Sequence, residues 1–156
     1  MTGPQLALAL RLPATSQFDN YVAGPNPEAL AAVRQLAQTA VPGMLFLTGA
    51  AGTGKTHLLQ AACRAAEAPG AYVPLKALAG HEPAVLEGLE QYPLVAIDDV
   101  QAIAGQTAWE EALFHLYNRL RDAGGRLLSA ASLAPEQLAL HLPDLRSRLA
   151  WGALYA

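Results

Sequence analysis

The hydrophobic and polar positions of this chain form two kinds of segment that alternate along it. Short continuous apolar runs predict buried strands, which we place at residues 44–48, 71–75, 94–97, 126–130 and 152–155. Longer segments with apolar residues at helical spacing predict helices, which we place at residues 28–38, 57–67, 82–90, 108–122, 135–142 and 144–149. Apolar strands that alternate with helices indicate an α/β fold, with a parallel five-stranded sheet flanked by helices on both faces.

The segment between the first predicted strand and the helix at 57–67 matches the phosphate-binding loop pattern G-x-x-x-x-G-K-[ST]. Its four fixed positions are Gly49, Gly54, Lys55 and Thr56. The further candidates for nucleotide contact are Gly52, Thr53 and His57. Glycines let the backbone turn so that several N–H groups point at one anion. Lys55 is then expected at the β- and γ-phosphates and Thr56 at Mg²⁺, with the start of the helix facing the phosphates.

A glycine-rich turn that arose by chance is the alternative interpretation of this loop. With glycine at about 7% of residues, four fixed positions match by accident in well under about one chain in a hundred of this size. The flanking strand and helix are the context that the motif requires. The sequence therefore predicts a P-loop NTPase fold that binds ADP or ATP with Mg²⁺.

Composition sets the broad class of the protein. The chain has 156 residues, of which 53% are hydrophobic and 15% charged, and its net charge is −3. This composition predicts a folded domain with no general electrostatic attraction to nucleic acid. We find neither a run of about 18 apolar residues that could span a membrane nor a secretory signal, and Cys63 is the only cysteine. We expect a cytoplasmic protein in which Cys63 is packed in the core.

A second chemical signal lies at the end of the predicted strand at 94–97. This apolar run continues directly into Asp98 and Asp99, as in a Walker B segment. Asp98 at the strand end is expected to hold Mg²⁺ through water, and Asp99 to activate the attacking water. The alternative is an ordinary transition from strand to loop with a capping aspartate.

Three segments together resemble one family, the DnaA group of AAA+ ATPases. Residues 97–101 are similar to its Walker B segment, residues 18–26 to its opening box and residues 142–152 to its arginine-finger segment. The matches keep their order and spacing from about residue 15 to the end of the chain. The resemblance implies an AAA+ nucleotide-binding base subdomain over residues 18–156, preceded by a tail over residues 1–17.

The resemblance also assigns functions to particular residues. Tyr21 and Val22 would form apolar walls of the adenine pocket, although without the family Phe18 and Tyr21 fit equally well as core anchors. Arg148 aligns with the arginine finger, which reaches a nucleotide held by a neighbouring subunit and stabilises charge on its γ-phosphate. Without the family Arg148 would be an ordinary surface arginine, and Arg146 is the neighbouring candidate.

The N-terminal tail carries a peptide that looks like a docking motif for the bacterial sliding clamp. Its expected anchors are Gln5, Leu6, Leu8 and Leu10, in an extended segment whose leucines alternate. The alternatives are a frayed tail or an edge strand. Such a tail is similar to that of the small regulatory DnaA paralogues of the Hda type, whose neighbour would be DnaA. Proteins of the Hda type would promote hydrolysis of DnaA-bound ATP and would affect DNA only indirectly.

Two features depart from the family pattern. Ser132 is the sensor 1 candidate, but it and Leu133 stand where the family usually has Asp and Arg, which leaves the chain's own ATP hydrolysis in question. The sequence also ends at Ala156, before the helical lid of AAA+ proteins, so we expect a truncated chain.

The competing function is that of a DnaA initiator or a DnaC-like helicase loader acting on DNA. The acidic net charge and the tail favour the regulator.

Overall fold

The protein is described by a computed structural model that places residues 27–39, 41–49, 54–66, 70–150 and 152–155. Within these residues a five-stranded sheet has the strand order β2-β3-β4-β1-β5, and each neighbouring pair is parallel. The strands are β1 Gly43–Thr48, β2 Ala71–Pro74, β3 Leu94–Asp98, β4 Arg126–Ala131 and β5 Ala153–Tyr155. The predicted α/β fold with a parallel five-stranded sheet is confirmed.

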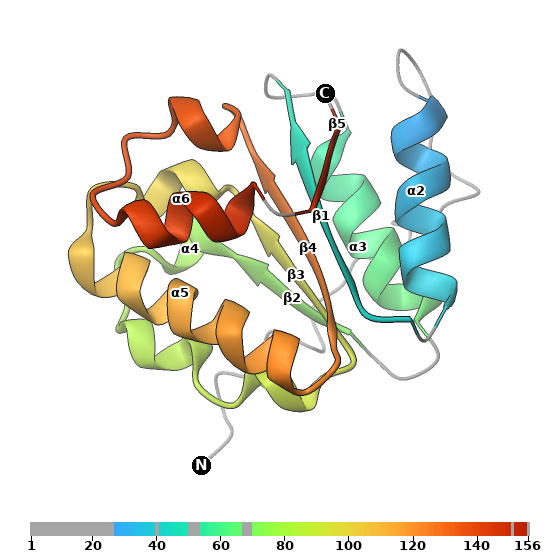
Figure 1. Ribbon diagram of the computed structural model, residues 1–156, viewed down its shortest axis with the longest axis horizontal. Helices are drawn as coiled ribbons and strands as arrows, with labels where there is room; N and C mark the ends of the chain where they lie inside the picture. The colour runs from blue at the N-terminus through green and yellow to red at the C-terminus, as the bar shows by residue number, and fades with distance from the viewer. Residues whose placement is uncertain (1–26, 40, 50–53, 67–69, 151, 156) are drawn as a thin grey trace.

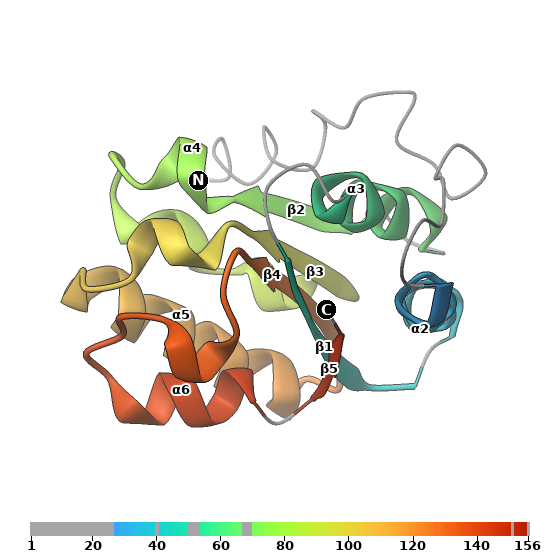
Figure 2. The same ribbon diagram turned by 90° about the horizontal axis from the view of Figure 1, so that it is seen from above.

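Helices cover both faces of the sheet, which gives three layers. Figures 1 and 2 show α2 and α3 on one face and α5 and α6 on the other. The helices are α2 Pro27–Gln38, α3 Lys55–Ala65, α4 Leu75–Leu78, α5 Thr107–Asp122 and α6 Pro143–Leu149. Short 3₁₀ turns complete the connections, namely η2 Pro83–Leu86, η3 Leu89–Gln91, η4 Val100–Ile103 and η5 Pro135–Gln137.

Each face of the sheet has its own hydrophobic core. β3 is buried at every position, as expected for a central parallel strand covered on both sides. Between the sheet and α5 the core includes the helically spaced residues Trp109, Leu113, Leu116 and Leu120. On the other face α2 and α3 pack through a second group of apolar residues, in which Cys63 is buried as predicted.

Three predicted elements differ from the structure. Residues 82–90 do not form one helix, because Gly88 adopts a left-handed backbone (φ 82°) that separates η2 from η3. The predicted helix at 135–142 is limited to the 3₁₀ turn η5, and its later backbone groups bond to side chains instead. Leu75 begins α4 rather than ending β2, because Pro74 has no N–H to continue the sheet ladder.

One edge of the sheet collects the predicted chemistry. The carboxyl ends of β1, β3 and β4 lie together there, since parallel strands run in the same direction. Gly49 follows β1, Asp98 ends β3 and Ser132 follows β4. Helix α3 begins at this edge after the phosphate loop and packs against β3 and β4. Among the described residues, no helix has the length and hydrophobicity needed to cross a membrane.

Candidate functional site: the carboxyl edge of the sheet

The described ends of the phosphate loop have backbone conformations that favour glycine. Gly49 has φ 149° and Gly54, which caps α3, has φ 91°. Lys55 and Thr56 then form the first turn of α3, and the Lys55 ammonium donates a hydrogen bond to the Gly49 carbonyl oxygen. Both ends of the predicted loop are thus brought together. Gly52 and Thr53 lie outside the described residues.

Asp98 is the centre of a buried hydrogen-bond network, with a side chain that is 1% exposed. Its Oδ2 atom accepts a hydrogen bond from Thr56 Oγ1 at 2.6 Å and another from the Tyr72 hydroxyl at 2.7 Å. Its Oδ1 atom accepts from the Asp99 backbone N–H at 3.0 Å. The structure therefore brings Thr56, the last residue of the phosphate-loop motif, directly against Asp98, the acid that ends β3.

This pair fits the group that the sequence predicts. Mg²⁺ prefers hard oxygen ligands and keeps several of its waters, and it is commonly held by one or two protein oxygens together with phosphates. Thr56 supplies a hydroxyl oxygen and Asp98 a carboxylate at the same point. Among the described residues, no cluster of three or more His, Cys, Asp or Glu side chains could hold a metal ion by itself.

The second acid, Asp99, is held in an unusual conformation. Its φ is 58°, and it is the only residue other than glycine with a positive φ in the described part of the chain. The left-handed region costs energy for a residue with a side chain, and such conformations concentrate at functional sites. Asp99 Oδ1 accepts a hydrogen bond at 3.1 Å from Gln101 Nε2.

Gln101 also connects Asp99 to the sensor 1 candidate. Its Oε1 atom accepts a hydrogen bond at 3.1 Å from the backbone N–H of Ser132. The Gln101 side chain therefore bridges Asp99, which follows β3, and Ser132, which follows β4. Sequence reasoning assigned Gln101 no role beyond its place in the motif, because the contact with Ser132 depends on the fold.

Tyr72 is a second residue of this network that sequence reasoning missed. Burial raises the pKa of its phenol, and the negative charge of Asp98 raises it further. The hydroxyl therefore keeps its proton and acts as a donor to the carboxylate. A tyrosine within the short apolar strand β2 is the one sequence signal that could have drawn attention to it.

The two arginines of α6 have different surroundings. Arg146 uses one guanidinium nitrogen to donate to the carbonyl oxygens of Leu138 and Leu140, both at 3.1 Å. Arg148 lies with its guanidinium carbon 5.3 Å from the centre of the Phe114 ring, and its Nε donates to Asn118 at 3.0 Å. Phe114 and Asn118 belong to α5, and the helix α6 that carries Arg148 lies with α5 on the opposite face of the sheet from α3 (Figure 2).

Glu110 fixes the approach to α6. This fully buried carboxylate accepts hydrogen bonds from three backbone N–H groups, those of Gly105, His141 and Leu142, at distances of 2.7–3.1 Å. Gly105 lies in the connection that follows β3, whereas His141 and Leu142 lead into α6. The Glu110 side chain thus links the segment that follows Asp98 and Asp99 to the start of α6, the helix that carries Arg148.

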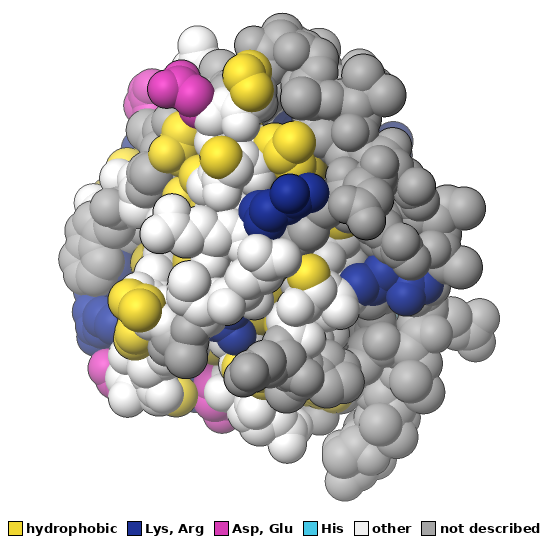
Figure 3. Space-filling model, turned by 90° about the vertical axis from the view of Figure 1, so that its right-hand side faces the viewer, with side chains coloured by type: hydrophobic (Ala, Val, Ile, Leu, Met, Phe, Trp, Pro, Cys, Tyr) yellow, Lys and Arg dark blue, Asp and Glu magenta, His cyan; other side chains and the backbone are white. Residues whose placement is uncertain are grey.

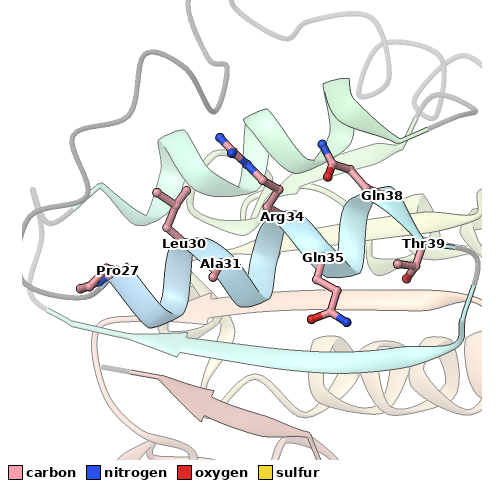
Figure 4. Close-up of a pocket in the computed structure, with 7 residues that line it drawn as sticks. All are labelled: Pro27, Leu30, Ala31, Arg34, Gln35, Gln38 and Thr39. Carbon is pink, nitrogen blue, oxygen red and sulfur yellow. The ribbon is translucent and has the colours of Figure 1, made fainter.

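A separate hollow lies along α2, away from this edge network. It has a volume of about 540 Å³ and is lined by the residues labelled in Figure 4, namely Pro27, Leu30, Ala31, Arg34, Gln35, Gln38 and Thr39. Figure 3 shows this side of the molecule, where the described apolar and cationic side chains are scattered and a few acidic ones lie at the margins. The described charged side chains form no continuous patch in this view. The other candidates, Tyr21 and Val22 for adenine and Gln5, Leu6, Leu8 and Leu10 for the clamp, lie outside the described residues.

Comparison with known proteins adds an independent finding. The chain matches the family described as the bacterial DnaA ATPase domain over residues 12–76 and 76–156. It is similar to the structure of replication initiator DnaA bound to AMPPCP and single-stranded DNA, with 26% identity and a TM-score of 0.82 over 93% of this chain and 50% of that one.

Two further DnaA structures resemble the chain. Domain III of DnaA from Thermotoga maritima shares 28% identity with a TM-score of 0.78, over 92% of this chain and 67% of that one. AMPPCP-bound DnaA from Aquifex aeolicus shares 25% identity with a TM-score of 0.79, over 92% of this chain and 50% of that one. The chain thus spans about half the length of the two AMPPCP-bound DnaA chains.

Proposed function

Because the chain belongs to the bacterial DnaA ATPase domain family, we propose that it binds an adenine nucleotide and regulates replication initiation in the manner of the Hda-type DnaA paralogues. In this role it docks on the sliding clamp and promotes hydrolysis of the ATP bound to DnaA. The proposal rests on the family, on the geometry of the carboxyl edge and on the N-terminal peptide.

The hydrogen bond between Thr56 and Asp98 is the observation that carries nucleotide binding. The phosphate loop and Lys55 would hold the β- and γ-phosphates of ADP or ATP, as positive charge and backbone N–H groups do at helix N-termini. Thr56 would supply a hydroxyl to Mg²⁺, and Asp98 would orient that hydroxyl through its 2.6 Å contact. When bound, the ion neutralises phosphate charge.

The chain's own hydrolysis is proposed to be weak. Asp99 would orient the attacking water, and Gln101 holds its carboxylate in place. At the end of β4, however, Ser132 contributes its backbone N–H to Gln101 and has only a hydroxyl side chain. A hydroxyl is a poorer partner for phosphate charge than a cation or a charge-assisted hydrogen bond. Bound nucleotide would then act as a conformational ligand.

Arg148 is proposed to be the finger that acts on the nucleotide of DnaA. The two carbonyl contacts of Arg146 support this assignment, because they turn its guanidinium toward the chain's own backbone. Arg148 instead lies over the Phe114 ring and donates to the Asn118 side chain, both on α5, and it is partly exposed. An arginine so placed can reach a phosphate on a neighbouring subunit.

Two assays with purified proteins test the regulatory role. In the first, hydrolysis of ATP bound to DnaA is measured with and without the chain, in the presence of DNA-loaded clamp. We expect stimulation that depends on both the chain and the clamp. In the second, capture on immobilised clamp is compared for the wild type and for Gln5→Ala/Leu6→Ala. Equal capture of both, or absence of any stimulation, contradicts the Hda-type assignment.

The alternative is an ATPase that acts directly on DNA, either a DnaA initiator or a DnaC-like helicase loader. The likeness to a DnaA structure bound to single-stranded DNA favours keeping it as the second candidate. Nucleotide-dependent binding of single-stranded DNA by this chain, with no effect of the clamp, would support the alternative over the regulator.

A further inference from the structure

The Tyr72 hydroxyl occupies a position that none of the assigned motifs explains. It donates to Asp98 Oδ2 at 2.7 Å, the same oxygen that accepts from Thr56. Tyr72 is 9% exposed, so its ring is largely enclosed between β2 and α3. The ring alone would satisfy the packing at this position, and the hydroxyl adds a specific contact to the carboxylate.

The sheet register explains why a tyrosine can make this contact. Tyr72 on β2 pairs with Ala96 on β3, so Asp98 is its diagonal neighbour, two residues farther along β3 on the same face. Diagonal neighbours on adjacent strands are about 7–8 Å apart, a distance that a long aromatic side chain can bridge. A shorter hydroxyl side chain at position 72 would not reach Asp98.

The two donors leave Asp98 with a fixed orientation. A carboxylate oxygen has two lone pairs, and both lone pairs of Oδ2 are used by Thr56 and Tyr72. Oδ1 accepts from the Asp99 backbone N–H, which leaves one acceptor position there. The carboxylate can therefore neither rotate freely nor turn its Oδ2 atom away from Thr56 without breaking a buried hydrogen bond.

We propose that Tyr72 is a positioning residue of the magnesium site, whose hydroxyl holds Asp98 aligned with Thr56. The inference rests on the proposed binding of a magnesium nucleotide at this edge. Without the hydroxyl, one lone pair of Oδ2 has no partner in a buried environment, and the carboxylate loses the contact that opposes its rotation. The Thr56 hydroxyl is then oriented less well for the ion, while the phosphate loop itself is unaltered.

The test measures how much Mg²⁺ strengthens ADP binding. Calorimetric dissociation constants are determined for ADP in excess Mg²⁺ and in EDTA, and their ratio gives the magnesium contribution. Changes to residues behind a metal ligand typically weaken metal binding about 10- to 100-fold. We expect Tyr72→Phe to reduce the magnesium contribution by about tenfold, with little change in metal-free ADP affinity.

Tyr117→Phe is the matched control, because it removes another buried hydroxyl, one that bonds Ser129 on the face covered by α5. It should leave the magnesium contribution unchanged. A merely structural role of Tyr72 would make Tyr72→Phe weaken ADP binding equally in Mg²⁺ and in EDTA, and this result would overturn the inference. An unchanged ratio of the two dissociation constants in Tyr72→Phe would overturn it as well. If the wild type takes up no ADP under either condition, the proposed function fails as well.

Discussion

Thr56 Oγ1 lies 2.6 Å from Asp98 Oδ2, although 42 positions separate the two residues in the chain. Thr56 follows β1 along the chain and Asp98 ends β3, and these two strands are not neighbours because β4 lies between them. The contact is possible because α3 starts after β1 and packs across β4 and β3, which carries its first turn toward the end of β3. The strand order and the path of one helix thus assemble the candidate magnesium site.

Replacement of Arg148 by alanine tests the proposed finger. Arginine fingers contribute about 10³–10⁵ to the rate of nucleotide hydrolysis. We expect Arg148→Ala to lower stimulation of DnaA ATP hydrolysis by about a hundredfold or more, without loss of clamp capture. Arg121→Ala, which removes an exposed arginine of α5, is the control and should retain stimulation. Equal activity of both variants would remove Arg148 from the proposed mechanism.

Glu110 is expected to be important for stability. Glu110→Ala leaves three partly buried backbone N–H groups without their carboxylate, and a buried donor left unsatisfied costs about 1–3 kcal/mol. We therefore expect the free energy of unfolding in urea to fall by about 3 kcal/mol or more. Glu111 is the next residue of α5 and is exposed, so Glu111→Ala should change stability by no more than about 0.5 kcal/mol. Similar losses for both variants would contradict this account of Glu110.

Cys63 predicts a dependence of stability on alkaline pH. Burial raises the pKa of its thiol from 9.0 to about 12 in the folded protein. Above pH 9 the unfolded chain releases this proton while the folded chain keeps it, so the stabilisation is complete below pH 9 and is lost as the pH rises toward 12. From pH 9 to 10 this group alone should lower the free energy of unfolding by about 1 kcal/mol.

Urea unfolding of the wild type and Cys63→Ala at pH 8, 9 and 10 isolates this effect. Tyr72 and Tyr117 also have raised pKa values, but both remain in the variant and cancel in the difference. The stability of the wild type relative to Cys63→Ala should therefore decrease between pH 9 and 10. A difference that stays constant with pH would show that the folded thiol titrates like the unfolded one.

The sheet and the longer helices could be predicted because their signals are local. Apolar runs identified all five strands, and the spacing of Trp109, Leu113, Leu116 and Leu120 identified α5, whose apolar face is buried. Apolar spacing predicts one helix at residues 82–90, because that spacing does not register the left-handed backbone that Gly88 adopts. In the segment after η5, the backbone is irregular because Glu110 and Arg146 satisfy its polar groups, which no local pattern reveals.

The candidate site was predictable only where a motif fixes residue types. The loop pattern identified Lys55 and Thr56, and the acids after an apolar strand identified Asp98 and Asp99. Tyr72 and Gln101 were missed because their roles depend on the register of β2 with β3 and on the nearness of the ends of β3 and β4. Both are partners of the acids rather than members of a spaced pattern, and the three-dimensional contacts are needed to find them.

Nucleotide uptake is the most direct measurement of the central claim. Isothermal titration of the chain with ADP and ATP in Mg²⁺ should show one adenine nucleotide bound per chain. Lys55→Ala removes the ammonium beside the loop and should weaken binding at least about tenfold, since hydrogen bonds to charged groups contribute about 1.5–3 kcal/mol. Lys76→Ala, in α4, should bind like the wild type. Absence of uptake by the wild type, or equal affinity of the wild type and Lys55→Ala, would contradict the account.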